Sequence, residues 1–110
     1  MPVSFTRAEV TPSSANTRAL LYTAPSGSTS IVFSGTVSNI DSTLKTDHMV
    51  TVEIKKTDLS YKSILKEVPI AYGGSLPLPK TILTAGEALW VTSVDDASCL
   101  TAIVAVALKS

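Results

Sequence analysis

Charged residues are scarce in this chain of 110 residues. They make up 16% of the sequence, with nine basic residues balanced by nine acidic ones, whereas an average soluble domain has roughly 25%. The densest positive spot is the pair Lys55-Lys56, which is too short to follow a phosphate backbone. The sequence therefore predicts no nucleic-acid binding, and it predicts a neutral surface that repels neighbouring copies only weakly.

Cysteine and histidine each occur once. Cys99 has no partner for a disulfide within the chain, and its apolar neighbours favour a buried thiol that packs as a small hydrophobic group. A nucleophilic role for Cys99 would need His48 as its base. No local pattern positions that histidine, so a structural or surface role is favoured for it.

Long apolar runs are also absent. Ala102–Leu108 is the longest apolar stretch, far below the roughly 20 residues of a membrane-spanning helix. The first ten residues have neither the charged nor the apolar region of a secretion signal. We therefore expect no membrane association, and synthesis in a cytoplasm.

The acidic residues follow no metal-binding or catalytic pattern. Asp95-Asp96 could chelate calcium together with Asp41 and Asp47, but the spaced acidic loop that surrounds a calcium ion is missing, so a solvated loop is favoured. Paired catalytic carboxylates and a serine or cysteine triad are missing as well. We expect no catalytic residue, no metal and no cofactor, and therefore a protein that is not an enzyme.

Aromatic residues are few, with three Tyr, two Phe and one Trp. Trp90 could stack on a sugar, but such a site would need several exposed aromatic side chains around it. We expect Trp90 to anchor the core or an interface instead.

The sequence does contain many short segments rich in Val, Ile and Thr, separated by turn residues at intervals of about 8–12 residues. The segment His48–Lys56 alternates most regularly, and no segment keeps a helical period for three turns. This pattern predicts an all-β, single-domain antiparallel β-sandwich of the jelly-roll or immunoglobulin-like type, with seven to eight strands. The expected core residues are Ile31, Phe33, Val50, Val52, Ile54 and Leu89.

The two ends of the chain carry the candidate interfaces. Residues 1–17 begin extended and continue into a polar run, which suits either an edge strand with a loop or an arm that reaches a neighbouring subunit. We interpret 1–17 as an extended N-terminal arm, with Phe5 as an interface candidate, and 18–110 as the β-sandwich domain. The closing segment Ser98–Leu108 is apolar on both faces, which indicates a central strand or a strand that covers an interface. The candidates on its second face are Ile103, Ala105 and Ala107, and Trp90 completes the set.

Three motifs between about Leu20 and Leu108 carry a resemblance to a known class of protein. They are the turn sequence in Leu21–Gly27 (LYTAPSG), the run Val37–Ser42 (VSNIDS) and the turn sequence in Leu83–Leu89 (LTAGEAL). We expect the first and last of these to form β-hairpins. Together they resemble the small β-sandwich virion proteins of tailed bacteriophages, which include capsid cement (decoration) proteins and related head–tail sandwiches.

The resemblance implies a structural protein of a tailed-phage particle that is assembled in the host cytoplasm and located in the virion. A capsid cement protein that clamps neighbouring major capsid subunits is the leading interpretation. The expected partners are the major capsid protein or other virion proteins, and further copies of the chain, as a trimer in preference to a dimer. A neck, collar or tail accessory protein and a carbohydrate- or receptor-binding sandwich are the alternatives.

Overall fold

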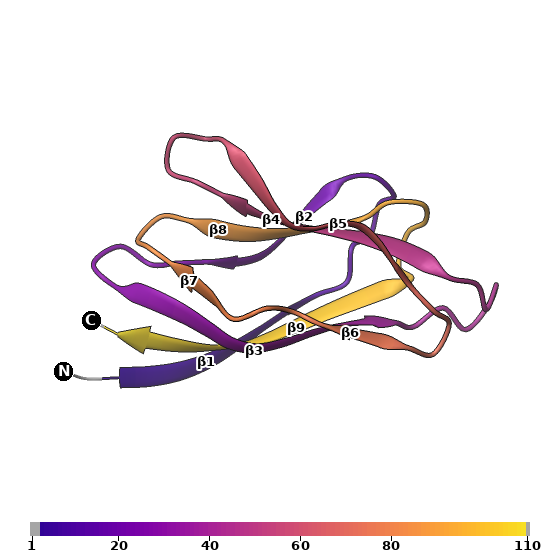
Figure 1. The fold of residues 1–110 in the computed structure, drawn as a ribbon, viewed down its shortest axis with the longest axis horizontal. Helices are drawn as coiled ribbons and strands as arrows, with labels where there is room; N and C mark the ends of the chain where they lie inside the picture. The colour runs from indigo at the N-terminus through magenta and orange to yellow at the C-terminus, as the bar shows by residue number, and fades with distance from the viewer. Residues whose placement is uncertain (1–2, 110) are drawn as a thin grey trace.

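The computed structural model describes residues 3–109, which form strands joined by turns and loops without a helix. The nine strands are β1 (Val3–Val10), β2 (Arg18–Thr23), β3 (Thr29–Asn39), β4 (His48–Lys55), β5 (Tyr61–Ile70), β6 (Ser75–Pro77), β7 (Thr81–Leu83), β8 (Ala88–Ser93) and β9 (Leu100–Lys109). The expected all-β sandwich is therefore confirmed (Figure 1).

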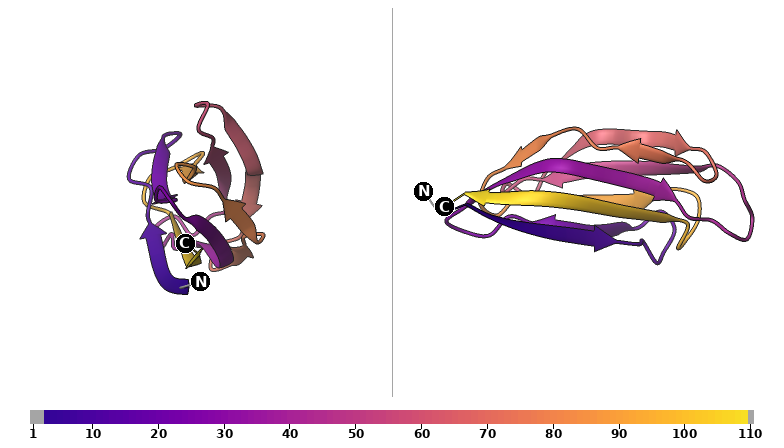
Figure 2. Two further views of the ribbon diagram at one scale, coloured as in Figure 1. Left: turned by 90° about the vertical axis from the view of Figure 1, so that its left-hand side faces the viewer. Right: turned by 90° about the horizontal axis from the view of Figure 1, so that it is seen from below.

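The strands form two antiparallel sheets that pack face to face (Figure 2). Sheet A has the order β1-β9-β3-β6, with β7 also paired to β3, and sheet B has the order β2-β8-β4-β5. The antiparallel pairs are nested along the chain: β1 with β9, β2 with β8, β3 with β6 and β7, and β4 with β5. With β6 and β7 counted as one interrupted edge strand, this nesting is a jelly roll of eight strands.

The structure has one strand more than the seven to eight expected. Residues 76–79 alternate Leu with Pro, and proline cannot donate to a ladder, so this segment suits only the rim of a sheet. In the structure β6 pairs with β3 over three residues, and the Leu78 N–H then donates to the Gly35 carbonyl at 2.9 Å. Because β6 lies at an edge of the sheet, the proline nitrogen, which has no hydrogen to donate, does not face a neighbouring strand.

The core lies between the sheets and is made of aliphatic side chains from both. Val50, Val52 and Leu89 are fully buried, as predicted, and Ile54 packs against them while half-buried. Ile31 and Phe33 were also expected in the core, but both lie on the outer face of sheet A, where Ile31 is half-buried and 47% of Phe33 is exposed. A β-bulge between Val32 and Ser34 adds one residue to β3. The bulge reverses the alternation, so Val32 and Val37 point inward while Phe33 points outward.

Residues 3–17 lie against the rest of the same chain, and residues 1–2 of the expected arm lie outside the described residues. Residues 3–10, expected as the start of an arm, form the edge strand β1, which pairs with β9 from Val3 to Val10. Ala8 and Val10 pack against the core, and Pro12 is buried. The extended conformation was expected, but this segment is a strand of the domain's own sheet, because β9 offers it a complete ladder of backbone partners.

The two motif turns also differ from expectation. The turn after Thr23 joins β2 of sheet B to β3 of sheet A, and the turn after Leu83 joins β7 of sheet A to β8 of sheet B. Neither is a hairpin. The two turns lie side by side, because Ala24 N–H donates to Glu87 O at 2.8 Å and Gly86 N–H donates to Ala24 O at 3.0 Å. The glycines in them, Gly27 and Gly86, have φ of 79° and 87°, which only glycine adopts without strain.

Candidate functional site

The outer face of sheet A carries an apolar surface. Alternate residues of the central strand β9 point away from the core, and among them 41% of Ile103 is exposed. The register places Phe5 of β1 opposite Ala107, and Ile31 of β3 opposite the same alanine. Figure 2 shows these strands face-on in its right-hand view.

Two phenylalanines lie at the centre of this surface. Phe5 is 72% exposed and Phe33 is 47% exposed, and their rings meet edge to face with centroids 6.0 Å apart. Ile82 of β7, opposite Ile31, continues the apolar row and is also exposed. We call this surface the sheet A face, and its apolar residues are Val3, Phe5, Ile31, Phe33, Ile82, Ile103, Ala105 and Ala107.

Four of the five interface candidates thus lie on one surface: Phe5, Ile103, Ala105 and Ala107. Trp90 lies on β8 in sheet B, half-buried, opposite Leu20 and Glu53. Its indole Nε1 is buried and has no hydrogen-bond partner. The sequence pattern placed Phe33 in the core, because the bulge in β3 leaves no signal in that pattern. It assigned Ile82 to neither the core nor an interface.

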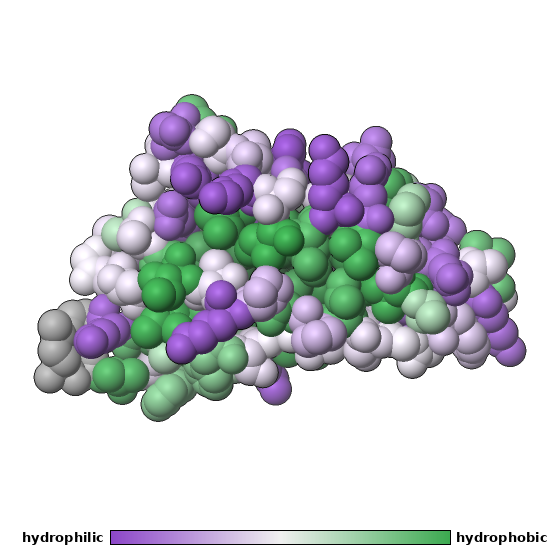
Figure 3. All heavy atoms as spheres, viewed as in Figure 1, coloured by the Kyte–Doolittle hydropathy of each residue, from purple (hydrophilic) through white to green (hydrophobic). Residues whose placement is uncertain are grey.

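A second apolar region lies at the side of the sandwich. Figure 3 shows it as a band between β5 and the β6–β7 edge. Half-buried residues of these edge strands, including Ile64, Leu65 and Leu76, pack against the core. On the opposite side of the sandwich β1 lies against β2 and covers the core.

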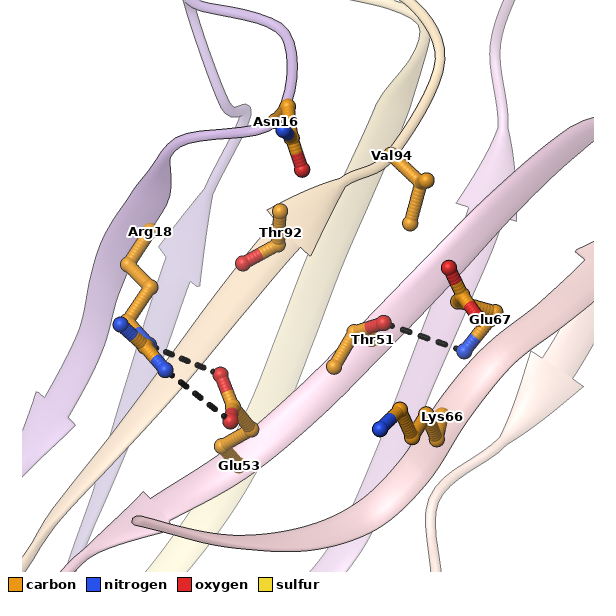
Figure 4. A pocket seen from close by; sticks show the side chains of 8 residues that line it. All are labelled: Asn16, Arg18, Thr51, Glu53, Lys66, Glu67, Thr92 and Val94. Carbon is orange, nitrogen blue, oxygen red and sulfur yellow. Dashed lines mark hydrogen bonds and ion pairs between the residues drawn. The ribbon is translucent and has the colours of Figure 1, made fainter. Parts of the chain in front are cut away.

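The outer face of sheet B is polar and holds a shallow pocket (Figure 4). Arg18 Nε donates to Glu53 Oε1 at 2.9 Å, and this hydrogen bond raises the pKa of the arginine. The guanidinium also lies 3.6 Å from the centre of the Tyr61 ring. Arg18 thus contacts both Glu53 and Tyr61 in this structure.

The only histidine lies in a buried polar cluster at the end of the sandwich away from the termini. His48 begins β4 and is 2% exposed. Its Nε2 lies 2.8 Å from Asp41 Oδ2 and its Nδ1 lies 3.1 Å from Asp95 Oδ2. Carboxylates accept hydrogen bonds, so both ring nitrogens carry protons and donate. The bond to Asp41 raises the pKa of His48 and lowers that of Asp41.

Cys99 completes this cluster. One ligating atom each of Asp41, His48 and Cys99 lies within 4.8 Å of the others, and all three residues are buried. Burial raises the pKa of the Cys99 thiol, which donates to Ala97 O at 3.2 Å. The expectation of a buried thiol is confirmed. The expectation that nothing positions His48 is wrong, because two carboxylates hold it.

These contacts define what the cluster can do chemically. Both nitrogens of His48 donate to carboxylates, so in this arrangement neither can accept a proton from Cys99. Of the four aspartates considered for calcium, Asp41 and Asp95 meet at His48, whereas Asp47 Oδ1 accepts from Tyr72 N–H at 3.4 Å. Asp41 is buried and is not part of a solvated loop. Sequence reasoning missed the cluster because its members are far apart in the chain.

No protein-family model and no curated protein matches the chain. The solved structures that are similar over nearly all of it include the following three. One chain from Bacillus endospore appendages, described as a family of disulfide-linked pili, has a TM-score of 0.59 at 13% identity and covers 98% of this chain and 88% of its own. One from the capsid of Helicobacter pylori bacteriophage KHP30 has 0.55 at 11% identity, covering 98% and 87%. One from the capsid of cyanophage Pam1 has 0.54 at 16% identity, covering 97% and 84%.

These similarities establish a shared β-sandwich fold. In residues 3–109 there is no helix long and apolar enough to cross a membrane.

Proposed function

We propose that this chain is a structural protein of a tailed-phage particle, and specifically a capsid cement protein. The observation that carries the proposal is the sheet A face, where Phe5 and Phe33 are exposed in contact with each other and Ile103 is exposed on the strand between theirs. Grouped exposed apolar side chains of this kind commonly mark a protein interface. Packing that face against a neighbouring subunit would bury them.

The comparisons support this proposal. Two of the similar structures described above come from phage capsids, and each matches nearly the whole chain. The third comes from pili, which are also assemblies of many subunits. The motif resemblance in the sequence points to the same class of protein. The balanced charge of the chain, nine residues of each sign, supports close packing because neighbouring copies repel one another weakly.

A cement protein acts by joining subunits that internal DNA pressure would separate. A small sandwich across such a junction buries surface on both sides, and many weakly bound copies together stabilise the shell by multivalency. The expected partners are the major capsid protein and further copies of this chain. A trimer suits the local threefold positions of an icosahedral shell, and a dimer at local twofold positions is the alternative. The particle would be assembled in the host cytoplasm.

We also propose that the chain is not an enzyme. Both ring nitrogens of His48 donate hydrogen bonds to carboxylates, so His48 is not free to accept a proton. The pKa of the Cys99 thiol is raised, which disfavours the nucleophilic thiolate.

A carbohydrate-binding role has less support. Trp90 is half-buried, and the ring of Tyr61 is covered by Arg18. A sugar would therefore find no open aromatic surface on the outer face of sheet B.

The test is to compare purified particles made with and without this protein. We expect the protein in purified heads, bound outside the shell in cryo-electron microscopy maps, and we expect heads that lack it to release DNA at a lower temperature. If the protein were found only in tails or necks, the chain would be a neck, collar or tail accessory protein and not a cement protein. Absence from particles, or binding on a glycan array with unchanged head stability, would overturn the proposal.

A further inference from the structure

The cluster at the end of the sandwich brings together three kinds of metal ligand. Asp41 offers a carboxylate oxygen, His48 an imidazole nitrogen and Cys99 a sulfur, all within 4.8 Å of one another and all buried. Tetrahedral zinc, with bonds of about 2.0–2.3 Å, separates its ligand atoms by roughly 3.3–3.7 Å. Small side-chain rotations are therefore enough to bring the three atoms onto one ion.

Neighbouring groups orient two of these ligands. Asp41 Oδ1 accepts hydrogen bonds from the backbone N–H groups of Thr43 and Leu44, each at 2.9 Å, so that Oδ2 faces His48. His48 Nδ1–H donates to Asp95 Oδ2 at 3.1 Å, which leaves Nε2 as the nitrogen directed at Asp41. A histidine that donates one N–H to a carboxylate and presents the other nitrogen is the usual arrangement at zinc sites.

We propose that Asp41, His48 and Cys99 bind one divalent ion of the zinc type, with Asp95 as the hydrogen-bond partner that orients His48. Thiolate, imidazole and carboxylate together suit zinc better than calcium or magnesium, which prefer oxygen ligands alone. This site is independent of the proposed role in a capsid.

The charges balance when the ion binds. Without metal, Asp41 is ionised, His48 carries a proton on Nε2, and Cys99 is a thiol. The ion displaces the Nε2 proton and the thiol proton, and both leave to solvent. Two positive charges replace two protons, so the net charge of the buried cluster does not change.

A surface hollow reaches two of the three buried ligands, Asp41 and Cys99, while His48 lies behind them. The hollow is lined by residues 40–44 and 96–99. This hollow would be the entry path for the ion, and a water molecule in it would serve as the fourth ligand. The bound ion would connect the loop between β3 and β4 to the loop between β8 and β9, at the end of the sandwich opposite the termini (Figure 1).

The experiment is a titration of the purified, metal-free chain with Co²⁺ and Zn²⁺. The chain has one cysteine and one histidine, so sulfur-to-cobalt charge-transfer absorption can arise only from Cys99. We expect this absorption at one ion per chain, its loss when Zn²⁺ is added, and a higher unfolding temperature with Zn²⁺ than with a chelator.

Three variants make the test specific. Cys99→Ala should fold, since it replaces a small buried side chain with a smaller one, and should lose both the cobalt absorption and the zinc-dependent stabilisation. Asp95→Asn should bind zinc about 10–100-fold more weakly, as expected for the partner of a ligating histidine. Asp58→Asn, at an exposed aspartate of the β4–β5 turn, is the control and should bind as the wild type does. No cobalt absorption in the wild type, one ion shared by two chains, or zinc affinity unchanged in Cys99→Ala would overturn the proposal.

Discussion

The rings of Phe5 and Phe33 meet edge to face, with centroids 6.0 Å apart, although their strands β1 and β3 are separated by β9. The contact crosses the small residues of β9, where Ala107 is the register partner of Phe5. Larger side chains on β9 would keep the two rings apart. The alanines of the closing strand therefore allow the aromatic pair to form the centre of the sheet A face.

The first prediction concerns this face. Ile103→Lys should reduce self-association and incorporation into particles, because it places a charge in the apolar surface while the side chain stays at an exposed position. The unfolding temperature should change little. Ser63→Lys, at an exposed position of β5 in the other sheet, is the matched control for the added charge. Sedimentation and particle incorporation measure the effect, and normal assembly of a folded Ile103→Lys protein would show that this face is not an interface.

The second prediction concerns the core. Val52 is fully buried on β4, so Val52→Asp would bury an unpaired carboxylate and cost on the order of 5 kcal/mol. This approaches the whole stability of a small domain, and we expect the variant to be unfolded by circular dichroism. Ser63→Asp introduces the same side chain at an exposed position of the same sheet and should remain folded. A cooperative unfolding transition near that of the wild type in Val52→Asp would contradict the assigned core.

The third prediction separates a structural strand from an arm. Deleting residues 2–12 should destabilise the isolated domain itself, because it removes the ladder between β1 and β9 and the contacts of Ala8 and Val10 with the core. It also removes Pro12, whose carbonyl accepts from Ser98 N–H at 2.8 Å. Thermal unfolding of the truncated chain measures the loss. If the truncated protein unfolds at the wild-type temperature and only fails to assemble, residues 2–12 act as an arm.

The fourth prediction is the pH dependence of stability, measured with a chelator present. The pKa of His48 is raised above its ordinary value of 6.5. The contribution of His48 to the free energy of unfolding is therefore complete below pH 6.5 and is lost as pH rises through the folded-state pKa. The pKa of Asp41 is lowered from 3.8, so its contribution is complete above that pH and is lost as pH falls. Stability should therefore be highest between about pH 4 and 6.5.

Variants assign the two limbs of that profile. Each residue is the main cause of the other's pKa shift, so His48→Gln should remove the loss of stability on the alkaline side and reduce the loss on the acidic side, and Asp41→Asn should do the reverse. Unfolding temperatures measured across the pH range test both. A wild-type profile that keeps rising above pH 7 would contradict the ion pair.

Much of the fold could be predicted because it depends on local chemistry. The alternation of Val50, Val52 and Ile54 shows which face of one strand is buried, since successive strand residues point to opposite faces. Gly27 and Gly86 mark turns because their backbone needs a positive φ. The apolar second face of Ser98–Leu108 indicated a central strand with an unusual outer surface. These features can be predicted because each one depends on neighbouring residues.

The tertiary structure decided the rest. Whether a turn leads to the same sheet or to the opposite one depends on which partner strand is already in place, so the two motif turns cross between sheets without any local sign of it. The bulge at Phe33 follows from fitting β3 to β9, and it exposes a ring that the alternation placed inside. Asp41, His48 and Asp95 meet although 47 residues separate the last two. Such contacts depend on how distant segments pack together, and the residue pattern of one segment alone does not predict that packing.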